Sequence, residues 1–162
     1  MTIRLLHEED WNVWKAFRHQ SLIDFPLAFP ISMEEEERLS DQQFKDWITR
    51  NTIYGAFLED QMIGSVGFFK LESSKEKHRG VLFGMNVLPA FQRHGLGGEL
   101  MTIILKHARK DVLQLHLTVV SSNQTAVRLY QRHGFKIYGT EPRSLKVDDH
   151  FYDHHLMVLF FD

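Results

Sequence analysis

The sequence predicts one α/β domain of the mixed α+β kind, residues 1–162, with a central, mostly antiparallel sheet of about seven strands flanked by helices. Three observations indicate this class. Segments with helical spacing of apolar residues are interspersed with strand-like segments, in which apolar and polar residues alternate. Several neighbouring strands are joined by short turns, and such connections produce antiparallel pairs. The chain has 162 residues, enough for one domain with a core of its own.

Periodicity and capping residues place the elements along the chain. Ser40, with Gln43 three residues later, has the pattern of a capping box that starts a helix. Asn123 can cap the last helix, and Gly134 can end it, because glycine adopts the left-handed conformation easily. The expected elements are a strand at 2–6, helices at 8–22, 33–39 and 40–48, strands at 52–58, 62–71 and 81–88, a helix at 99–110, a strand at 113–119, a helix after 123, and strands at 135–145 and 150–161.

The connections predict how the strands pair. Short turns make the strands at 52–58, 62–71 and 81–88 successive antiparallel neighbours. A helix intervenes between 81–88 and 113–119, so we expect these two strands to be parallel. The sheet is therefore predicted to be mixed.

Composition excludes several classes of protein. The content of 43% hydrophobic and 25% charged residues is that of an ordinary soluble globular protein. A net charge of −2 argues against a nucleic-acid partner, and no apolar run reaches the roughly 20 residues that cross a bilayer. The charged N-terminal residues do not resemble a signal peptide, so we expect a cytoplasmic protein without a membrane partner. The absence of cysteine excludes disulfides and an acyl-cysteine intermediate.

A glycine-rich segment at 92–98 lies between the strand at 81–88 and the helix at 99–110. Its sequence is Gln-Arg-His-Gly-Leu-Gly-Gly. Glycine lets backbone N–H groups approach a ligand without a Cβ atom in the way. The first turn of the helix adds unpaired N–H groups and the positive end of its dipole. The segment therefore predicts a site for a phosphate or pyrophosphate group.

Two common phosphate-binding motifs do not fit this segment. A dinucleotide fingerprint needs a third glycine where Leu100 stands, and no P-loop pattern occurs in the chain. The segment instead matches Gln-x-x-Gly-x-Gly through Gln92, Gly95 and Gly97. A second motif follows downstream and consists of Asn123, Ala126, Leu129, Tyr130, Gly134 and Phe135. Through these two motifs, in this order and context, the chain resembles the GCN5-related N-acetyltransferase (GNAT) family over essentially its whole length.

The resemblance implies that acetyl-CoA is the acyl donor. Backbone amides of the glycine-rich segment would hold its pyrophosphate, and the end of the preceding strand would pair with the pantetheine arm where that strand diverges from its parallel neighbour. A backbone N–H near Val87 would polarise the thioester carbonyl. Asn123 would contact the coenzyme, although a helix cap is its commonest role at such a site. The implied cofactor-binding residues are Met85, Asn86, Val87, Gln92, Arg93, His94, Gly95, Leu96, Gly97, Gly98, Asn123 and Tyr130.

Tyr130 is the residue to which the resemblance assigns the general acid. Attack of an amine on a thioester expels a thiolate, which needs a proton. The reference pKa of tyrosine, about 10, is near that of a thiol, about 8.5, so the hydroxyl can donate effectively. The alternative role is that of a core aromatic residue on the buried face of its helix.

The sequence leaves the general base open. Some family members use a glutamate on the strand before the glycine-rich segment, but residues 81–88 contain no carboxylate. Glu35 is the candidate we name first, together with its neighbours in the glutamate run at 34–37. Such a run is usually a solvated face, and we expect at least three of the four to lie in solvent. The further candidates are His116, Asp153, His154 and a chain of water molecules.

The histidines of the last strand do not predict a metal site. His150 and His154 would share one face of that strand, whereas Asp153 and His155 would share the other. Their side chains would therefore not converge on one ion, and no metal is expected.

The sequence thus predicts an acetyl-CoA-dependent N-acetyltransferase that transfers the acetyl group directly to a primary amine of a small molecule (an amino acid or a polyamine-like compound) or of a peptide. Phe29, Tyr152 and Asp153 are the expected substrate-binding residues. One alternative is a non-catalytic acyl-CoA-binding sensor or subunit, because the strand carboxylate is missing. Another is an acetyltransferase of a protein or ribosomal N-terminus. We expect a monomer or a homodimer.

Overall fold

The computed structural model describes all 162 residues, and its seven strands form one sheet in the order β1-β2-β3-β4-β5-β7-β6. Neighbouring strands are antiparallel except for β4 and β5, which confirms the predicted mixed, mostly antiparallel sheet. The strands are β1 (Thr2–Leu5), β2 (Thr52–Leu58), β3 (Gln61–Lys70), β4 (Arg79–Val87), β5 (Gln114–Val120), β6 (Lys136–Val147) and β7 (His150–Phe160). The helices are α1 (Trp11–Asp24), α2 (Met33–Glu37), α3 (Asp41–Arg50), α4 (Leu96–Asp111) and α5 (Gln124–Arg132), with short 3-10 turns at Glu8–Asp10, Pro26–Ala28 and Pro89–Phe91.

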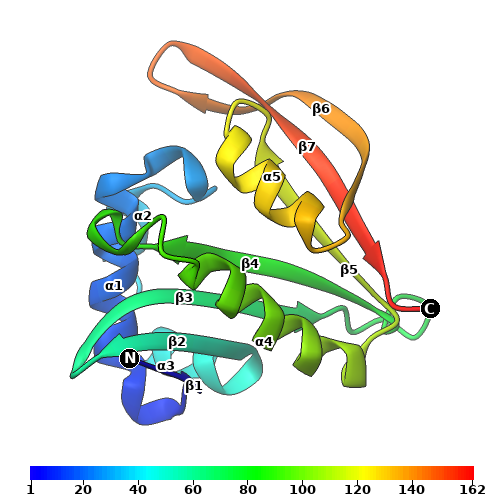
Figure 1. Ribbon diagram of the computed structural model, residues 1–162. Coiled ribbons are helices and arrows are strands. Elements are labelled where there is room, and N and C mark those ends of the chain that lie inside the picture. Colours follow the sequence, from blue (N-terminus) through cyan, green and yellow to red (C-terminus); the bar gives the residue numbers. More distant parts are fainter.

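Helices cover both faces of the sheet. In Figure 1, α4 and α5 lie in front of the sheet, and α1 and α3 lie on its other side. The α4 side chains Leu100, Met101 and Ile104 are fully buried against the front face, in one hydrophobic cluster. Phe17 of α1 and Phe44 of α3 belong to a second cluster on the other face. Each such side chain contributes roughly 1.5–3 kcal/mol by its removal from water. None of the helices is both long and apolar enough to span a membrane.

The predicted capping signals are present. Ser40 Oγ accepts the Gln43 N–H at 3.1 Å, and Gln43 Oε1 accepts the Ser40 N–H at 2.8 Å, so the capping box of α3 is complete. Asn123 Oδ1 accepts the Ala126 N–H at 3.2 Å at the start of α5. Gly134, just after α5, has a φ of 96°, which is the expected left-handed conformation.

The start of α4 differs from the prediction. The helix begins at Leu96 rather than at residue 99, so Gly97 and Gly98 belong to its first turn. Glycine is a poor helix former, and the sequence pattern therefore placed these residues in the loop. The helix begins early because Gly95, with a φ of 82°, turns the chain directly into it.

The sheet opens between its two parallel strands. Pairing of β4 with β5 is confined to Arg79, Gly80 and Val81, and beyond Val81 the strands diverge (Figure 1). On its other edge β4 stays paired with β3 as far as Val87, with an irregular register opposite Ser65–Gly67. Gly84 lies in this irregular stretch with a φ of 64°, which glycine adopts at little cost. The result is a strand end with one free edge that faces the opening.

Candidate active site

Six consecutive backbone amides at the start of α4 have no partner within the chain. The first helical hydrogen bond is Glu99 N–H to Gly95 O, at 3.1 Å, so the amides of residues 96–98 are unpaired. The amides of Arg93, His94 and Gly95 also donate no backbone bond, and no side chain caps the helix. Arg93 and Gly95 both have positive φ, at 67° and 82°. Such a conformation turns successive N–H groups toward one side, and with the helix dipole it forms an anion-binding concavity.

This run of amides lies beside the opening of the sheet. A Cβ atom added to Gly97 would lie 3.3 Å from Cε of Met85 on β4 and 3.5 Å from Cδ2 of Leu129 on α5. The Gln92 side chain donates a hydrogen bond from Nε2 to the Val87 carbonyl at 2.9 Å and so fixes the loop to the end of β4. The residues predicted to bind the coenzyme from residue 85 to residue 98 are therefore brought together. The side chains of Leu96 and Val87 are buried in the core, and the Leu96 N–H has no backbone partner.

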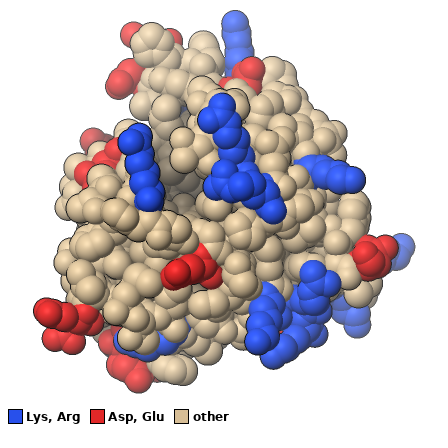
Figure 2. All heavy atoms as spheres, viewed as in Figure 1, with Lys and Arg blue, Asp and Glu red and all other residues tan.

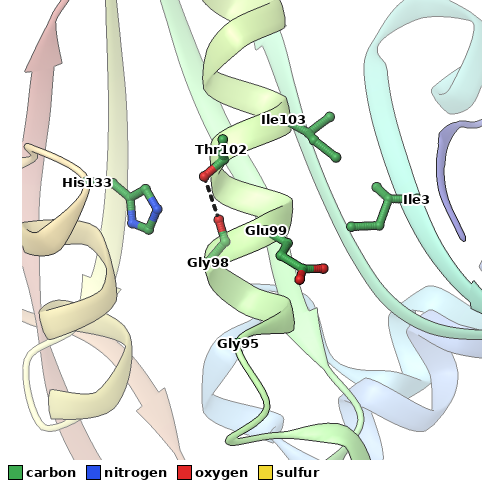
Figure 3. Close-up of a pocket in the computed structure, with 7 residues that line it drawn as sticks. All are labelled: Ile3, Gly95, Gly98, Glu99, Thr102, Ile103 and His133. Carbon is green, nitrogen blue, oxygen red and sulfur yellow. Dashed lines mark hydrogen bonds between the residues drawn. The ribbon is translucent and has the colours of Figure 1, made fainter. Parts of the chain in front are cut away.

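A shallow hollow of about 520 Å³ continues from the amide run along the first turns of α4. Figure 3 shows its lining, with His133 on the α5 side of α4 and Glu99, Ile103 and Ile3 on the opposite side. His133 Nδ1 donates to the Leu129 carbonyl at 2.9 Å, since a carbonyl can only accept. The other ring nitrogen is left available to a ligand in this hollow. Figure 2 shows a hollow near α5 in the same view, with Lys and Arg side chains on both sides of it.

His133 is a candidate binding residue that the sequence did not identify. Its proximity to Gly98, where an added Cβ would lie 3.9 Å from its Cε1, comes from the packing of α5 beside α4. No local sequence signal marks such a contact.

Tyr130 is buried on α5, with its ring 6.0 Å from that of Phe135 in an edge-to-face arrangement. Burial raises the pKa of Tyr130 to about 12, because a phenolate would lose its hydration there. The hydroxyl is therefore protonated at physiological pH, as a proton donor must be. Tyr130 also belongs to the hydrophobic core, which is the structural role that the sequence offered as the alternative.

The three expected substrate-binding residues belong to two parts of the chain, since Phe29 follows the turn at Pro26–Ala28 and Tyr152 and Asp153 lie on β7. Phe29 is buried, and its ring lies 5.2 Å from the guanidinium carbon of Arg18. Asp153 on β7 is exposed, and its carboxylate accepts the Arg143 N–H at 2.8 Å, which supports an irregular turn of β6 where Arg143 has a φ of 51°. Tyr152 is half-buried on the same hairpin.

The glutamate run of α2 contains one buried residue, and it is not Glu35. Glu35 is exposed, and its carboxylate accepts the Ser32 N–H at 3.3 Å in the capping box of the helix. Glu36 is fully buried and accepts a hydrogen bond from Arg18 Nε at 2.7 Å. Glu34 and Glu37 are exposed, as expected for at least three of the four. The sequence does indicate that Arg18 is buried, because it is a charged residue within the apolar stripe of its helix.

Two of the further base candidates, His116 and His154, are histidines on strands. The pKa of His116 is lowered first by burial and then by the nearby charges of Arg79 and His78. The pKa of His154 is also lowered by burial, and its Nδ1 lies 2.7 Å from Ser144 Oγ. Both imidazoles are therefore neutral at pH 7.

Comparison with known proteins identifies the family and the fold. The family model of the acetyltransferase (GNAT) family matches residues 14–135. A mycothiol acetyltransferase of Streptomyces griseus is 31% identical over 127 residues, which cover 78% of this chain and 39% of that protein. N-alpha-acetyltransferase 50 of Danio rerio is 26% identical over 123 residues, or 74% of this chain and 69% of that protein. The chain spans about two fifths of the length of the mycothiol acetyltransferases that it matches.

Solved structures agree with this fold over the full chain. An acetyltransferase of the GNAT family from Streptococcus pneumoniae superimposes with a TM-score of 0.89 at 24% identity, covering 98% of each chain. The yncA protein of Salmonella typhimurium, solved with its cofactor acetyl-CoA, superimposes with a TM-score of 0.87 at 18% identity, covering 100% of this chain and 94% of that one. With a family model that spans most of its length, this chain belongs to the acetyltransferase (GNAT) family.

Proposed function

We propose that this protein is an acetyl-CoA-dependent N-acetyltransferase that transfers the acetyl group directly to a primary amine. The observation that carries the proposal is the run of unpaired amides from Arg93 to Gly98, placed where β4 and β5 diverge. Unpaired amides at a helix start fit a pyrophosphate, and the free edge of β4 fits an extended arm with its own amide groups. Family membership supports the same assignment.

The residues of the site divide the work as follows. The amides of residues 93–98 hold the diphosphate, and His133 contacts the nucleotide end in the hollow along α4. Residues 85–87 hold the pantetheine arm, with the Val87 backbone near the carbonyl that must be polarised. Bound acetyl-CoA supplies the thioester, whose acyl carbon an amine attacks without a covalent enzyme intermediate.

Tyr130 supplies the proton for the departing sulfur. Its raised pKa makes the proton harder to remove than that of a free tyrosine. The same apolar surroundings also disfavour the thiolate that leaves beside it, so both acids become weaker together. The pKa values of the tyrosine and the thiol therefore stay close to each other. Proton transfer also requires that the hydroxyl lie within hydrogen-bond reach of the sulfur.

The acceptor is a primary amine of a small molecule or of a peptide. Similarity to mycothiol acetyltransferases and to N-alpha-acetyltransferase 50 supports both kinds. A structure of Arabidopsis thaliana NAA60 with a bisubstrate analogue, with a TM-score of 0.76, shares the fold. A panel that contains amino acids, polyamines and short peptides with free N-termini will separate the two kinds.

The test is release of free thiol from acetyl-CoA in the presence of each amine of that panel. We expect release that depends on both amine and enzyme, with a product heavier than the amine by one acetyl group. If acetyl-CoA binds but no amine accelerates thiol release, the alternative of a non-catalytic acyl-CoA-binding module is correct. If acetyl-CoA does not bind, both assignments fail.

A further inference from the structure

Arg18 connects four elements behind the opening of the sheet. Its guanidinium carbon lies 5.3 Å from the ring of Trp14 on α1, 4.4 Å from Trp47 on α3 and 5.2 Å from Phe29. Its Nη1 atom is the nearest neighbour, at 3.8 Å, of a Cβ placed on Gly84 in the irregular stretch of β4. The ion pair with Glu36 brings α2 to the same place. Arg18 thus lies between Glu36 and Gly84, just before the strand end that we assign to the thioester.

Several unpaired polar atoms lie on the elements that this ion pair joins. Four buried side-chain nitrogen or oxygen atoms of the chain have no hydrogen-bond partner, namely His19 Nε2, Ser21 Oγ, Glu36 Oε2 and Asn86 Nδ2. They belong to α1, α2 and β4, the elements that Arg18 connects. An unpaired buried polar atom costs about 1–3 kcal/mol, so such a group calls for a water molecule, a ligand or a role in catalysis. The free oxygen of Glu36 is the only carboxylate oxygen among them.

We propose that Glu36 is the proton acceptor for the amine in the transfer reaction, acting through a bound water, and that His19 passes this proton to solvent. This inference rests on the proposed function and names the base that the function requires. Oε1 of Glu36 is occupied by Arg18, which fixes the carboxylate in one orientation. Oε2 is free, and it lies 3.8 Å from Nε2 of His19, whose side chain is 22% exposed. Oε2 thus faces His19, which leads toward solvent, and Arg18 connects the carboxylate to β4.

The proton balance of the reaction needs one such group. An ammonium group gives one proton to the water next to Glu36 and becomes a nucleophilic amine. Its nitrogen forms a bond to the acetyl carbon, the carbon–sulfur bond breaks, and the sulfur takes the Tyr130 proton. The second proton lost by the nitrogen restores the tyrosine hydroxyl, so one proton in total leaves through Glu36 and His19. The products are the amide and the free thiol of the coenzyme.

Arg18 and His19 are the cationic or titratable groups within 4 Å of the Glu36 carboxylate. Arg18 keeps its charge, and it neutralises the carboxylate while that group is ionised. Burial lowers the pKa of Arg18, whereas the charge of Glu36 and the hydrogen bond to it raise that pKa. A buried pair of this kind contributes little net stability when compared with apolar residues of the same volume. A catalytic requirement accounts for its presence better than a requirement of stability does.

The test compares Glu36→Gln with Glu35→Gln, the adjacent residue on α2. Both are measured with the best amine of the panel, from pH 5.5 to 10, together with the acetyl-CoA dissociation constant and Tm. We expect E36Q to bind acetyl-CoA within twofold of wild type and to lose about 10²- to 10⁴-fold in kcat. The pH profile of its kcat should also lack an acidic limb. E35Q should match wild type. An E36Q enzyme with a wild-type kcat and pH profile would overturn the proposal.

Glu36→Asp covers the case in which E36Q does not fold. The shorter carboxylate can still pair with Arg18 but lies farther from the water, so we expect kcat to fall at least tenfold while the acidic limb remains. A folded E36D enzyme with unchanged kcat would contradict a role in proton transfer. His19→Gln should lower kcat at low buffer concentration, with recovery on addition of imidazole; absence of both effects would overturn the exit path. Failure of the proposed function is distinct, because the wild-type enzyme would then release no thiol with any amine.

Discussion

Cε of Met85 on β4 lies 3.3 Å from the position that a Cβ atom on Gly97 would occupy, so the Met85 side chain packs against the first turn of α4 at a residue without a side chain. Leu129 of α5 closes the third side at 3.5 Å. The three elements thereby surround the point at which the unpaired amides meet the opening of the sheet. A side chain at residue 97 would occupy the path that we assign to the coenzyme.

Gly97→Ala is expected to weaken acetyl-CoA binding without loss of stability. The position has an ordinary helical φ, and alanine is favoured over glycine in a helix by about 1 kcal/mol. That gain offsets the small shift which Met85 must make. We expect the dissociation constant of acetyl-CoA to rise about tenfold, by isothermal titration calorimetry, while Tm stays within about 1–2 °C, a change of about 0.5 kcal/mol. An unchanged affinity would show that the coenzyme does not pass close to this residue.

Gly95→Ala, unlike Gly97→Ala, should lower the free energy of unfolding. Nothing lies within 4 Å of an added Cβ, but the φ of 82° costs an L-residue about 1–2 kcal/mol. Urea unfolding should report this loss. Gly139→Ala is the control, because its φ is not positive and its nearest contact would be an ordinary 3.6 Å. Equal stability of the G95A and G139A variants would contradict the role of Gly95 as the turn into α4.

Tyr130→Phe should lower kcat about 10²- to 10⁴-fold with little change in acetyl-CoA affinity. The ring and its contact with Phe135 remain, so Tm should change little. Because burial raises the pKa of Tyr130 to about 12, wild-type kcat should not fall on the alkaline side below about pH 10. An unchanged kcat in the variant would remove Tyr130 from the mechanism.

His133→Ala should weaken acetyl-CoA binding about three- to tenfold, as expected for the loss of one hydrogen bond of roughly 1 kcal/mol. The measurement is the dissociation constant of the coenzyme, compared with that of a shortened pantetheine thioester. The shortened donor should bind both enzymes equally, because it does not reach the hollow along α4. His150→Ala at the tip of the β6–β7 hairpin is the control and should change neither constant.

Asp10 should make stability depend on acid pH. Its carboxylate accepts hydrogen bonds from Arg4 at 2.8 Å and from the His7 N–H at 2.8 Å, and these interactions lower the pKa of Asp10 below its ordinary 3.8. The stabilisation is present above the unfolded-state value and disappears as pH falls through the lower folded-state pKa. We expect Asp10→Asn to lose about 1 kcal/mol at pH 7, by urea unfolding, and the difference from wild type to shrink below about pH 4. A difference that stays constant down to pH 2 would refute this assignment.

Much of the fold could be predicted because its signals are local. Helical spacing, the Ser40–Gln43 capping box and the left-handed Gly134 each depend on a few successive residues. Short turns fixed the antiparallel order of β2, β3 and β4, and the intervening helix made β5 parallel to β4. The start of α4 was misplaced by three residues, because glycine propensity is weaker evidence than the positive φ of Gly95.

The two residues that we propose for proton transfer show where local reasoning ends. The motif around Tyr130 placed it on a helix, but its burial and raised pKa depend on Phe135 and the core beneath it. Four successive glutamates indicated an acidic helix, but which of them is buried depends on the rotation of α2 against Arg18 of α1, eighteen positions away. That choice moved our candidate base from Glu35 to Glu36.

The sequence by itself determined the family and located the residues of the amide run, since these follow from motifs of adjacent residues. Tertiary structure alone decided how far β4 and β5 stay paired, that His133 lies beside Gly98, and that Arg18 buries one carboxylate behind Gly84. The physical reason is that the proposed donor site uses consecutive backbone groups. The other contacts join side chains of separate elements, whose meeting depends on the packing of the whole core.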